Sequence, residues 1–291
     1  MSDLQIRRNL LGFELTDGER PIAQYRACEE LPADESPKPC FAPIYTGQGT
    51  PITEYRPADH RWHTGLYFGW VHANQANLWG GGWFLPEKGH YEDVPGTHGA
   101  QRHVAFAELG MDGGAARVDE ELTWVDAAGE ALAAERRHYV LGRCDGGYLW
   151  QIRSRVEPAG DALTLGATRA EAAYSGLILR MGPAFTRGDG ARHLSSEGAV
   201  GHEATMHSRA RWVGVEGADD GMVVMMDHPA NPRHPAPWFT RANLLGTAPL
   251  MDGDLTIGRG QALELCYGFA VLDEPVPAER VETLYSTFAS S

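Results

Sequence analysis

Short apolar runs separated by tight turns recur through most of this chain, and that rhythm restricts its fold more than any other feature. From about residue 104 onward, runs of β-branched, aromatic and aliphatic residues are divided by turn sequences such as CDGG at 144–147 and GADDG at 217–221. Gly and Asp supply the backbone conformations that hairpin turns require. The sequence therefore predicts a string of hairpins, and hence an antiparallel all-β fold.

Individual segments support this prediction. Residues 116–125 and 148–156 alternate apolar and polar side chains as half-buried strands do, with Glu120 as the exception. The acidic run 119–121 around it is typical of a solvated strand face. Three further runs are apolar on both faces, as buried central strands are: 176–181, 221–226 and 263–272.

Helical periodicity is clear only near the C-terminus. Val281, Leu284, Tyr285 and Phe288 recur on one helix face after Pro277, which suits a first helical turn. Length and the lack of a composition shift favour one domain over residues 1–291. We therefore expect a large antiparallel β-sandwich with a short C-terminal helix packed across a sheet.

Composition excludes several classes of partner. The chain has 25 Lys and Arg against 39 Asp and Glu, a formal net charge of -14. Nucleic acids and anionic membranes are held by clustered Lys and Arg, so neither is expected as a partner. No apolar run approaches the roughly 20 residues that span a bilayer, and the first residues lack the apolar core of a signal peptide. Four scattered cysteines without a CxxC pair predict free thiols, and together these features predict a cytoplasmic protein. A homo-oligomer is left open.

Histidine and tryptophan are concentrated in one segment. Six of the twelve histidines fall between His60 and His103, interleaved with four tryptophans that include Trp79, and a glycine triplet follows at 80–82. Imidazoles serve as acid, base or metal ligand near neutral pH, and indole faces stack on sugar C–H surfaces. This segment predicts a cleft for a carbohydrate.

Two motifs within this segment supply candidate catalytic residues. In DHRWHTG, Asp59 precedes His60, and a second imidazole follows at His63. These groups would share acid and base work or bind a divalent metal, provided that the segment turns or bulges there. In GTHGAQRH, His98 and His103 lie in a glycine-flanked loop that runs into a strand. A surface or structural role is the alternative for each of them.

Downstream, DHPANPRHPAPWFTR contains four prolines, which fix the backbone and position side chains at small entropic cost. The segment adds His228 to the catalytic candidates, and its other candidates for substrate binding are Asn231, Arg233, His234 and Trp238. A structural crossing between strands is the alternative. Arg180 lies within an otherwise apolar strand, where a guanidinium needs a ligand or an acid such as Glu171.

These blocks carry a family resemblance. DHRWHTGLYFGW, ANQANLWGG, YSGLILRMGPAF, DHPANPRHPAPWFTR and LELCYGFAVLD, in that order over about residues 40 to 273, resemble a bacterial family of unknown function that is often labelled "PmoA family". The label is borrowed from methane oxygenase, an integral membrane enzyme, and no run of this chain spans a bilayer. The resemblance implies a β-sandwich similar to the galactose-mutarotase type and an association with sugar uptake and sugar oxidoreductases.

Mutarotase-like proteins combine histidine acids with a carboxylate base on one concave sheet face. The resemblance implies that the acid comes from His60, His63, His98, His103 and His228. No position of this chain matches the carboxylate base of that type.

Two functions follow from these features. The first is an enzyme of sugar catabolism that acts on a sugar, an oxidised (keto) sugar or a glycoside by histidine-mediated acid and base chemistry, as a lyase, an epimerase or a glycoside-cleaving enzyme. Removal of a proton beside a carbonyl needs a base near neutrality and a cation to hold the enolate, which the histidines and Arg180 or Arg233 would supply. The second is a non-catalytic sugar-binding or regulatory module, with the tryptophans as its stacking surface.

Overall fold

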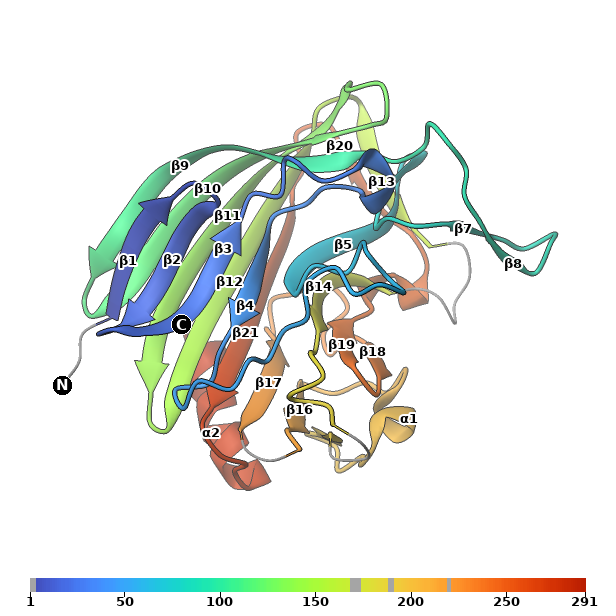
Figure 1. The fold of residues 1–291 in the computed structure, drawn as a ribbon. Helices are drawn as coiled ribbons and strands as arrows, with labels where there is room; N and C mark the ends of the chain where they lie inside the picture. The colour runs from blue at the N-terminus through green and yellow to red at the C-terminus, as the bar shows by residue number, and fades with distance from the viewer. Residues whose placement is uncertain (1–3, 168–173, 188–190, 219–220) are drawn as a thin grey trace.

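Two large antiparallel sheets pack face to face in this computed structural model, which describes residues 4–167, 174–187, 191–218 and 221–291 (Figure 1). The predicted antiparallel β-sandwich is confirmed. Every ladder between named strands is antiparallel within these residues.

The first sheet has eleven strands. Its main path runs, in spatial order, through β1 (Leu4–Asn9), β2 (Gly12–Asp17), β3 (Arg20–Arg26), β4 (Cys40–Ile44), β5 (Leu66–Ala73), β14 (Ser175–Arg180), β19 (Leu244–Thr247) and β18 (Trp238–Arg241). Three short strands join beside β5: β6 (Ala76–Leu78), β13 (Ala162–Gly166) and β20 (Leu255–Gly258).

The second sheet has eight strands. Their spatial order is β15 (Arg192–Ser195), β16 (Trp212–Glu216), β17 (Met222–Asp227), β21 (Leu263–Leu272), β12 (Gly147–Pro158), β11 (Ala131–Cys144), β10 (Ala115–Val125) and β9 (Ala100–Asp112). The hairpin of β7 (Trp83–Leu85) and β8 (His90–Glu92) projects away from both sheets (Figure 1). In the described residues, the helical segments are α1 (His202–Thr205), α2 (Ala278–Ala289) and the 3₁₀ turns Ala33–Glu35 and Pro249–Asp252.

The predicted strands and helix agree with these elements. Segments 116–125 and 148–156 lie in β10 and β12, and the runs that are apolar on both faces coincide with β14, β17 and β21. The C-terminal helix α2 begins after Pro277 and buries all four predicted residues. It packs on the outer face of β17 and β21, where Met226, Cys266 and Ala270 lie. No helix in the described part of the chain is both long enough and apolar enough to cross a membrane.

Side-chain alternation divides the apolar residues into a main core and two outer clusters. On β14, Leu177 and Leu179 point into the main core between the sheets, whereas Ile178 belongs to a cluster on the outer face of the eleven-stranded sheet. Because side chains alternate along a strand, Arg180 shares the outer face with Ile178. The cluster under α2 lies on the opposite outer face, that of the eight-stranded sheet. The sandwich therefore offers two separate outer faces.

One sequence prediction fails inside the sandwich. Glu120 was expected on a solvated face, but it is 1% exposed and points inward from β10. Its carboxylate accepts hydrogen bonds from the Tyr139 hydroxyl (3.1 Å) and from Tyr25, and it lies 2.8 Å from His103 Nδ1. A buried carboxylate needs such partners, and the strand period places it on the same face as Val118. His103, a predicted catalytic residue, is therefore engaged in an interior network.

Candidate functional site

A hollow of about 830 Å³ lies on the outer face of the eleven-stranded sheet, within the roughly 300–1,000 Å³ typical of small-molecule sites. We call it the imidazole pocket. Loop 57–63, the glycine turn that follows β6, the hairpin of β18 and β19, and α1 surround it. Its principal lining residues are Asp59, His60, Trp62, His63, Trp79, Tyr91, Tyr174, Arg180, His202, Phe239 and Arg241.

The two histidines of the DHRWHTG motif converge because the loop turns twice. The backbone N–H of His60 donates to the carbonyl of Pro57 (3.1 Å), and that of His63 donates to the carbonyl of His60 (2.9 Å). The two imidazoles consequently stack, with ring centroids 4.9 Å apart and planes 24° apart. The turn that the sequence required for their convergence is present.

Asp59 and His60 form a hydrogen-bonded pair at the rim of the pocket. Asp59 Oδ2 lies 2.8 Å from His60 Nδ1, and the other carboxylate oxygen lies 3.7 Å from a guanidinium nitrogen of Arg180. The hydrogen bond from His60 holds the pKa of Asp59 below its ordinary value. An ionised Asp59 selects the tautomer with the proton on Nδ1, so Nε2 of the neutral ring is left as the acceptor nitrogen. This arrangement is suited to a general base.

His63 is a buried, neutral imidazole behind this pair. It is 5% exposed, and its Nδ1 has no hydrogen-bond partner in the described part of the chain. Burial lowers its pKa to about 2, so the ring carries no charge at physiological pH. A buried polar atom without a partner is costly and calls for an explanation, and a hydrogen bond to a bound molecule is one. His63 can hydrogen-bond a bound molecule without adding charge.

Arg180 extends from the end of β14 into the pocket. Its side chain is 8% exposed, and Nε donates to Glu54 Oε2 at 3.1 Å. With Asp59 also close, two carboxylates offset its charge. The acid suggested by the sequence, Glu171, lies outside the described residues. Arg180 therefore holds Asp59 in place while remaining part of the pocket wall.

Aromatic rings form the rest of the wall. The ring of Tyr174 lies 4.4 Å from that of Trp79 and 4.9 Å from that of Phe239, as measured between centroids. The guanidinium of Arg241 covers Phe239 at 4.7 Å. Tyr91, from the projecting hairpin, reaches the same wall, with its hydroxyl 3.2 Å from that of Tyr174. Flat apolar surfaces edged by hydroxyl and guanidinium groups suit a ligand that has both C–H faces and hydroxyls.

Side chains behind the pocket pin its glycine turn. Asn77 Oδ1 accepts hydrogen bonds from the backbone N–H groups of Trp79 and Gly80, both at 2.8 Å. Lys38, whose pKa burial lowers to about 7, donates to the carbonyl of Trp79 at 2.8 Å. His98 Nε2 lies 2.7 Å from the carbonyl oxygen of Gly81. The expectation that His98 faces the cleft is wrong, because its ring nitrogen is committed to supporting the turn.

The polar candidates of the proline-rich segment, Asn231, Arg233 and His234, do not line the imidazole pocket. His234 Nδ1 lies 2.7 Å from Asp227 Oδ2, and Asn231 donates to the other oxygen of Asp227 at 2.7 Å. Arg233 donates to the backbone carbonyls of Pro249, Gly253 and Asp254. These residues fit the alternative interpretation, a structural crossing between strands. Their polar groups hydrogen-bond within the protein rather than to a ligand.

Trp238 was predicted to bind substrate, but it is 0% exposed and belongs to the main core. Its Nε1 donates to the carbonyl of Ala210 at 2.8 Å. On β18, alternation sends Trp238 inward and the next residue, Phe239, outward into the pocket. The sequence prediction chose Trp238, whereas its neighbour Phe239 is the aromatic residue of this strand that lines the pocket.

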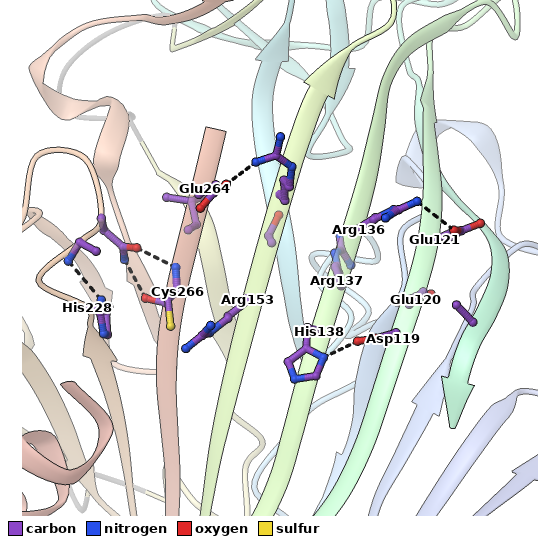
Figure 2. A pocket seen from close by; sticks show the side chains of 16 residues that line it. Asp119, Glu120, Glu121, Arg136, Arg137, His138, Arg153, His228, Glu264 and Cys266 are labelled. Atoms are coloured by element: carbon purple, nitrogen blue, oxygen red, sulfur yellow. Dashed lines mark hydrogen bonds and ion pairs between the residues drawn. The ribbon is translucent and has the colours of Figure 1, made fainter. Parts of the chain in front are cut away.

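His228 faces a different hollow. This hollow, of about 630 Å³, lies on the outer face of the eight-stranded sheet, and we call it the charged trough (Figure 2). His228 Nδ1 accepts from the N–H of Ala230 at 3.1 Å, and its ring packs 5.3 Å from Phe288 of α2. The side chains that define the trough are Asp119, Glu121, Arg136, His138, Arg153, Arg155, His228 and Glu264.

Most charges of the trough are paired across neighbouring strands, as Figure 2 shows. His138 contacts Asp119, Arg136 lies 3.6 Å from Glu121, and Arg155 contacts Glu264. Among the described residues, no Phe, Tyr or Trp lines this hollow. The arrangement is that of a solvated strand face on which opposite charges are register partners.

The sequence analysis missed His202. It lies in the single helical turn α1, opposite the DHRWHTG loop in the pocket wall. Behind it, 6.0 Å away between ring centroids, lies His193, whose pKa burial lowers to about 4. No motif surrounds His202 in the sequence, and a four-residue helix has too little periodicity to reveal its orientation.

The alternative of a divalent metal site has no set of ligands among the described residues. Among the described residues, no group of three or more His, Cys, Asp or Glu side chains is arranged to hold a metal ion. The imidazole pocket therefore unites His60, His63, Trp79 and Arg180 of the predicted site residues, and acid and base chemistry by these side chains is what its geometry offers.

Comparison with known proteins gives a family but no function. A family model described as "Family of unknown function (DUF6807)" matches residues 12–286. No curated protein matches the chain. Among solved structures, the crystal structure of the Slr1438 protein from Synechocystis sp. PCC 6803 is similar at 14% identity over 90% of this chain and 88% of that chain, with a TM-score of 0.41. The likeness to PmoA-labelled and mutarotase-type proteins stays a prediction.

Proposed function

For a chain that belongs to the DUF6807 family of unknown function, we propose an enzyme that binds a sugar, an oxidised (keto) sugar or a glycoside and moves a proton on it. The observation that carries this proposal is the Asp59–His60 pair, stacked on the buried neutral His63 in an aromatic-walled hollow. A positioned base with an orienting carboxylate beside apolar stacking surface is what such a reaction needs.

Each group has a role in this proposal. His60 Nε2 takes a proton from a carbon next to a carbonyl or, in mutarotation, from the anomeric hydroxyl, and Asp59 stabilises the imidazolium that forms. Neutral His63 and the guanidinium of Arg180 supply hydrogen bonds to the oxygen on which negative charge develops. Protonation of the opposite face by a water molecule gives epimerisation. In elimination or glycoside cleavage, the imidazolium of His60 gives its proton to the group that leaves the adjacent carbon.

The setting that we propose is cytoplasmic. All four cysteines are free thiols, including Cys28 and Cys40, whose sulfur atoms lie 3.5 Å apart without a bond. Unbridged thiols this close suit a reducing compartment. The partner is a small-molecule carbohydrate, because the pocket has the size of a small-molecule site and the net charge of -14 opposes binding to nucleic acid.

A second candidate function is a non-catalytic sugar-binding or regulatory module. The stacked wall of Trp79, Tyr174 and Phe239 favours it, because such a wall binds sugars without any chemistry. In that case the His60–Asp59 pair acts only as a hydrogen-bonding group.

Two assays on the full chain separate these candidates. Polarimetry follows the mutarotation of α-D-glucose, and proton NMR in D₂O follows deuterium uptake and product release from methyl 3-keto-glucopyranoside. We expect turnover of at least one probe and a loss of about 100-fold or more in His60→Ala, the contribution typical of a general base. Affinity, measured by calorimetry, should change only a few-fold. Asp59→Asn should lower the rate without removing binding.

The chain offers a matched control in His138→Ala, which removes the histidine of the other exposed His–Asp pair. Its rate should equal that of the wild type. An unchanged rate in His60→Ala would refute the role of His60 as the base. Tight binding of the probes without any turnover would establish the binding module instead.

A further inference from the structure

A second, smaller hollow adjoins the imidazole pocket. It has a volume of about 310 Å³ and shares Asp59, Trp62 and Gly82 with the larger one. Its own lining includes Asp34, Glu35, Arg61 and Asp93. We call it the acidic annex. Because the two hollows have Trp62 in common, that indole stands between them.

Trp62 is held rigidly by the glycine turn. A Cβ atom added to Gly81 would lie 2.6 Å from Cζ2 of the Trp62 indole, closer than atoms can approach. Gly80 and Gly81 also have φ values of +103° and +65°, which favour glycine. The indole therefore lies directly against bare backbone, and the imidazole of His60 fixes its edge at 5.1 Å. Trp62 is a fixed aromatic partition rather than a mobile surface residue.

The annex combines one buried, paired carboxylate with two exposed ones. Glu35 is 4% exposed and accepts from Arg56 Nε at 2.6 Å and from Arg61 Nε at 3.2 Å. Asp34 and Asp93 line the same hollow, and neither forms an ion pair with the described part of the chain. Carboxylates in such positions accept hydrogen bonds from hydroxyl or amino groups and repel anions.

We propose that the acidic annex is a second sugar subsite and that the substrate contains two sugar units, with its glycosidic link passing Trp62. One unit occupies the imidazole pocket, where the chemistry takes place. The other occupies the annex and is neutral or carries an amino group, because Asp34 and Asp93 line the annex without an ion pair in the described part of the chain, whereas arginines offset the charge of Glu35 and Asp59. This inference rests on the proposed function and narrows its substrate class to neutral or basic disaccharides and related glycosides.

Calorimetry on the full chain tests the subsite with D-glucose, maltose and cellobiose as probes. At least one disaccharide should bind ten-fold or more tightly than glucose. In the double variant Asp34→Asn, Asp93→Asn, this advantage should fall below about three-fold, while the affinity for glucose stays within two-fold of the wild type. Retained glucose binding also shows that the variant is folded. The matched control Asp119→Asn, Glu121→Gln, in the charged trough, should keep both affinities.

The outcomes separate the two proposals. Equal affinities for glucose and both disaccharides in the wild type would overturn the subsite and leave the proposed function standing. An advantage that survives in the double variant would also overturn it. Failure of the wild type to bind any of the three sugars, together with no turnover of the keto-glucoside probe, would overturn both.

Discussion

The imidazole pocket and the charged trough each contain a histidine paired through Nδ1 with an aspartate, yet they are built in different ways. Asp119 and His138 face each other because the register of β10 and β11 makes them partners, as it does for Glu121 and Arg136. Asp59 and His60 are neighbours in the chain, and a loop turn carries both to a hollow. A His–Asp pair alone is therefore weak support for function.

What distinguishes the pocket is its surroundings. It adds aromatic walls, a buried imidazole without a partner and a glycine turn fixed from behind. The trough also contains a buried imidazole nitrogen without a partner in the described part of the chain, His228 Nε2, but its exposed charges pair across neighbouring strands and none of its described lining residues is Phe, Tyr or Trp. The aromatic walls and the glycine turn fixed from behind therefore separate the two hollows better than the identity of their charged residues does.

The largest effect is expected where the pocket depends on its glycine turn. In Gly81→Ala, the added methyl overlaps the Trp62 indole and the backbone has a φ of +65°, so we expect a loss of about 3 kcal/mol in the free energy of unfolding. Gly129→Ala, in the turn that joins the trough strands β10 and β11, has a φ of +87° but open space around the new methyl. It should cost only about 1 kcal/mol. Urea unfolding measures both, and equal losses would contradict the rigid partition.

The next effect concerns pH. The pKa of His63 is about 2 in the folded protein against an ordinary value of 6.5, so below pH 6.5 the unfolded chain binds a proton that the folded chain does not. Stability from this group is complete above pH 6.5 and falls as the pH drops, by about 2 to 3 kcal/mol at pH 4.5. In His63→Phe, the free energy of unfolding should fall less on acidification, by this amount.

Urea unfolding of the wild type and His63→Phe at pH 7 and pH 4.5 provides the measurement. His138→Gln, the control from the trough, should lose as much stability as the wild type. A parallel fall in the wild type and His63→Phe would show that His63 titrates normally and is not buried in a neutral state.

The smallest effect is expected for the ion pairs. Arg136 is 79% exposed and Glu121 44%, so Arg136→Gln should change the free energy of unfolding by less than about 0.5 kcal/mol. Arg180 is 8% exposed and holds two carboxylates, so Arg180→Gln should cost about 1 to 2 kcal/mol. Added salt should remove the first difference and not the second. Equal, salt-sensitive losses would erase the distinction between the two hollows.

The sequence was sufficient for the fold because sheet and helix periods are written in local patterns. Alternation located β10 and β12, and one apolar stripe located α2. The same period also explains Glu120, since its even spacing from Val118 already placed it on the buried face. Its charge suggested solvent, whereas alternation was the better guide.

The site could be predicted only where its residues share a short motif. His60 and His63 belong to one such motif and meet in the pocket. The sequence does not distinguish His98 and His234, which have structural roles, from these two pocket histidines. The reason is that the partner of an imidazole nitrogen is a distant backbone group or another side chain. The prolines of the segment 227–241 suggested a backbone shaped for a ligand. They instead fix the contacts that the segment makes within the protein.

The opposite placement of the two hollows has a practical consequence. The pocket opens from the outer face of one sheet and the trough from the outer face of the other, with the main core between them. A fluorophore or a tether attached to a cysteine introduced at Arg136 would point away from the imidazole pocket. The protein can thus be fixed to a sensor surface through β11 with this pocket turned toward the solution.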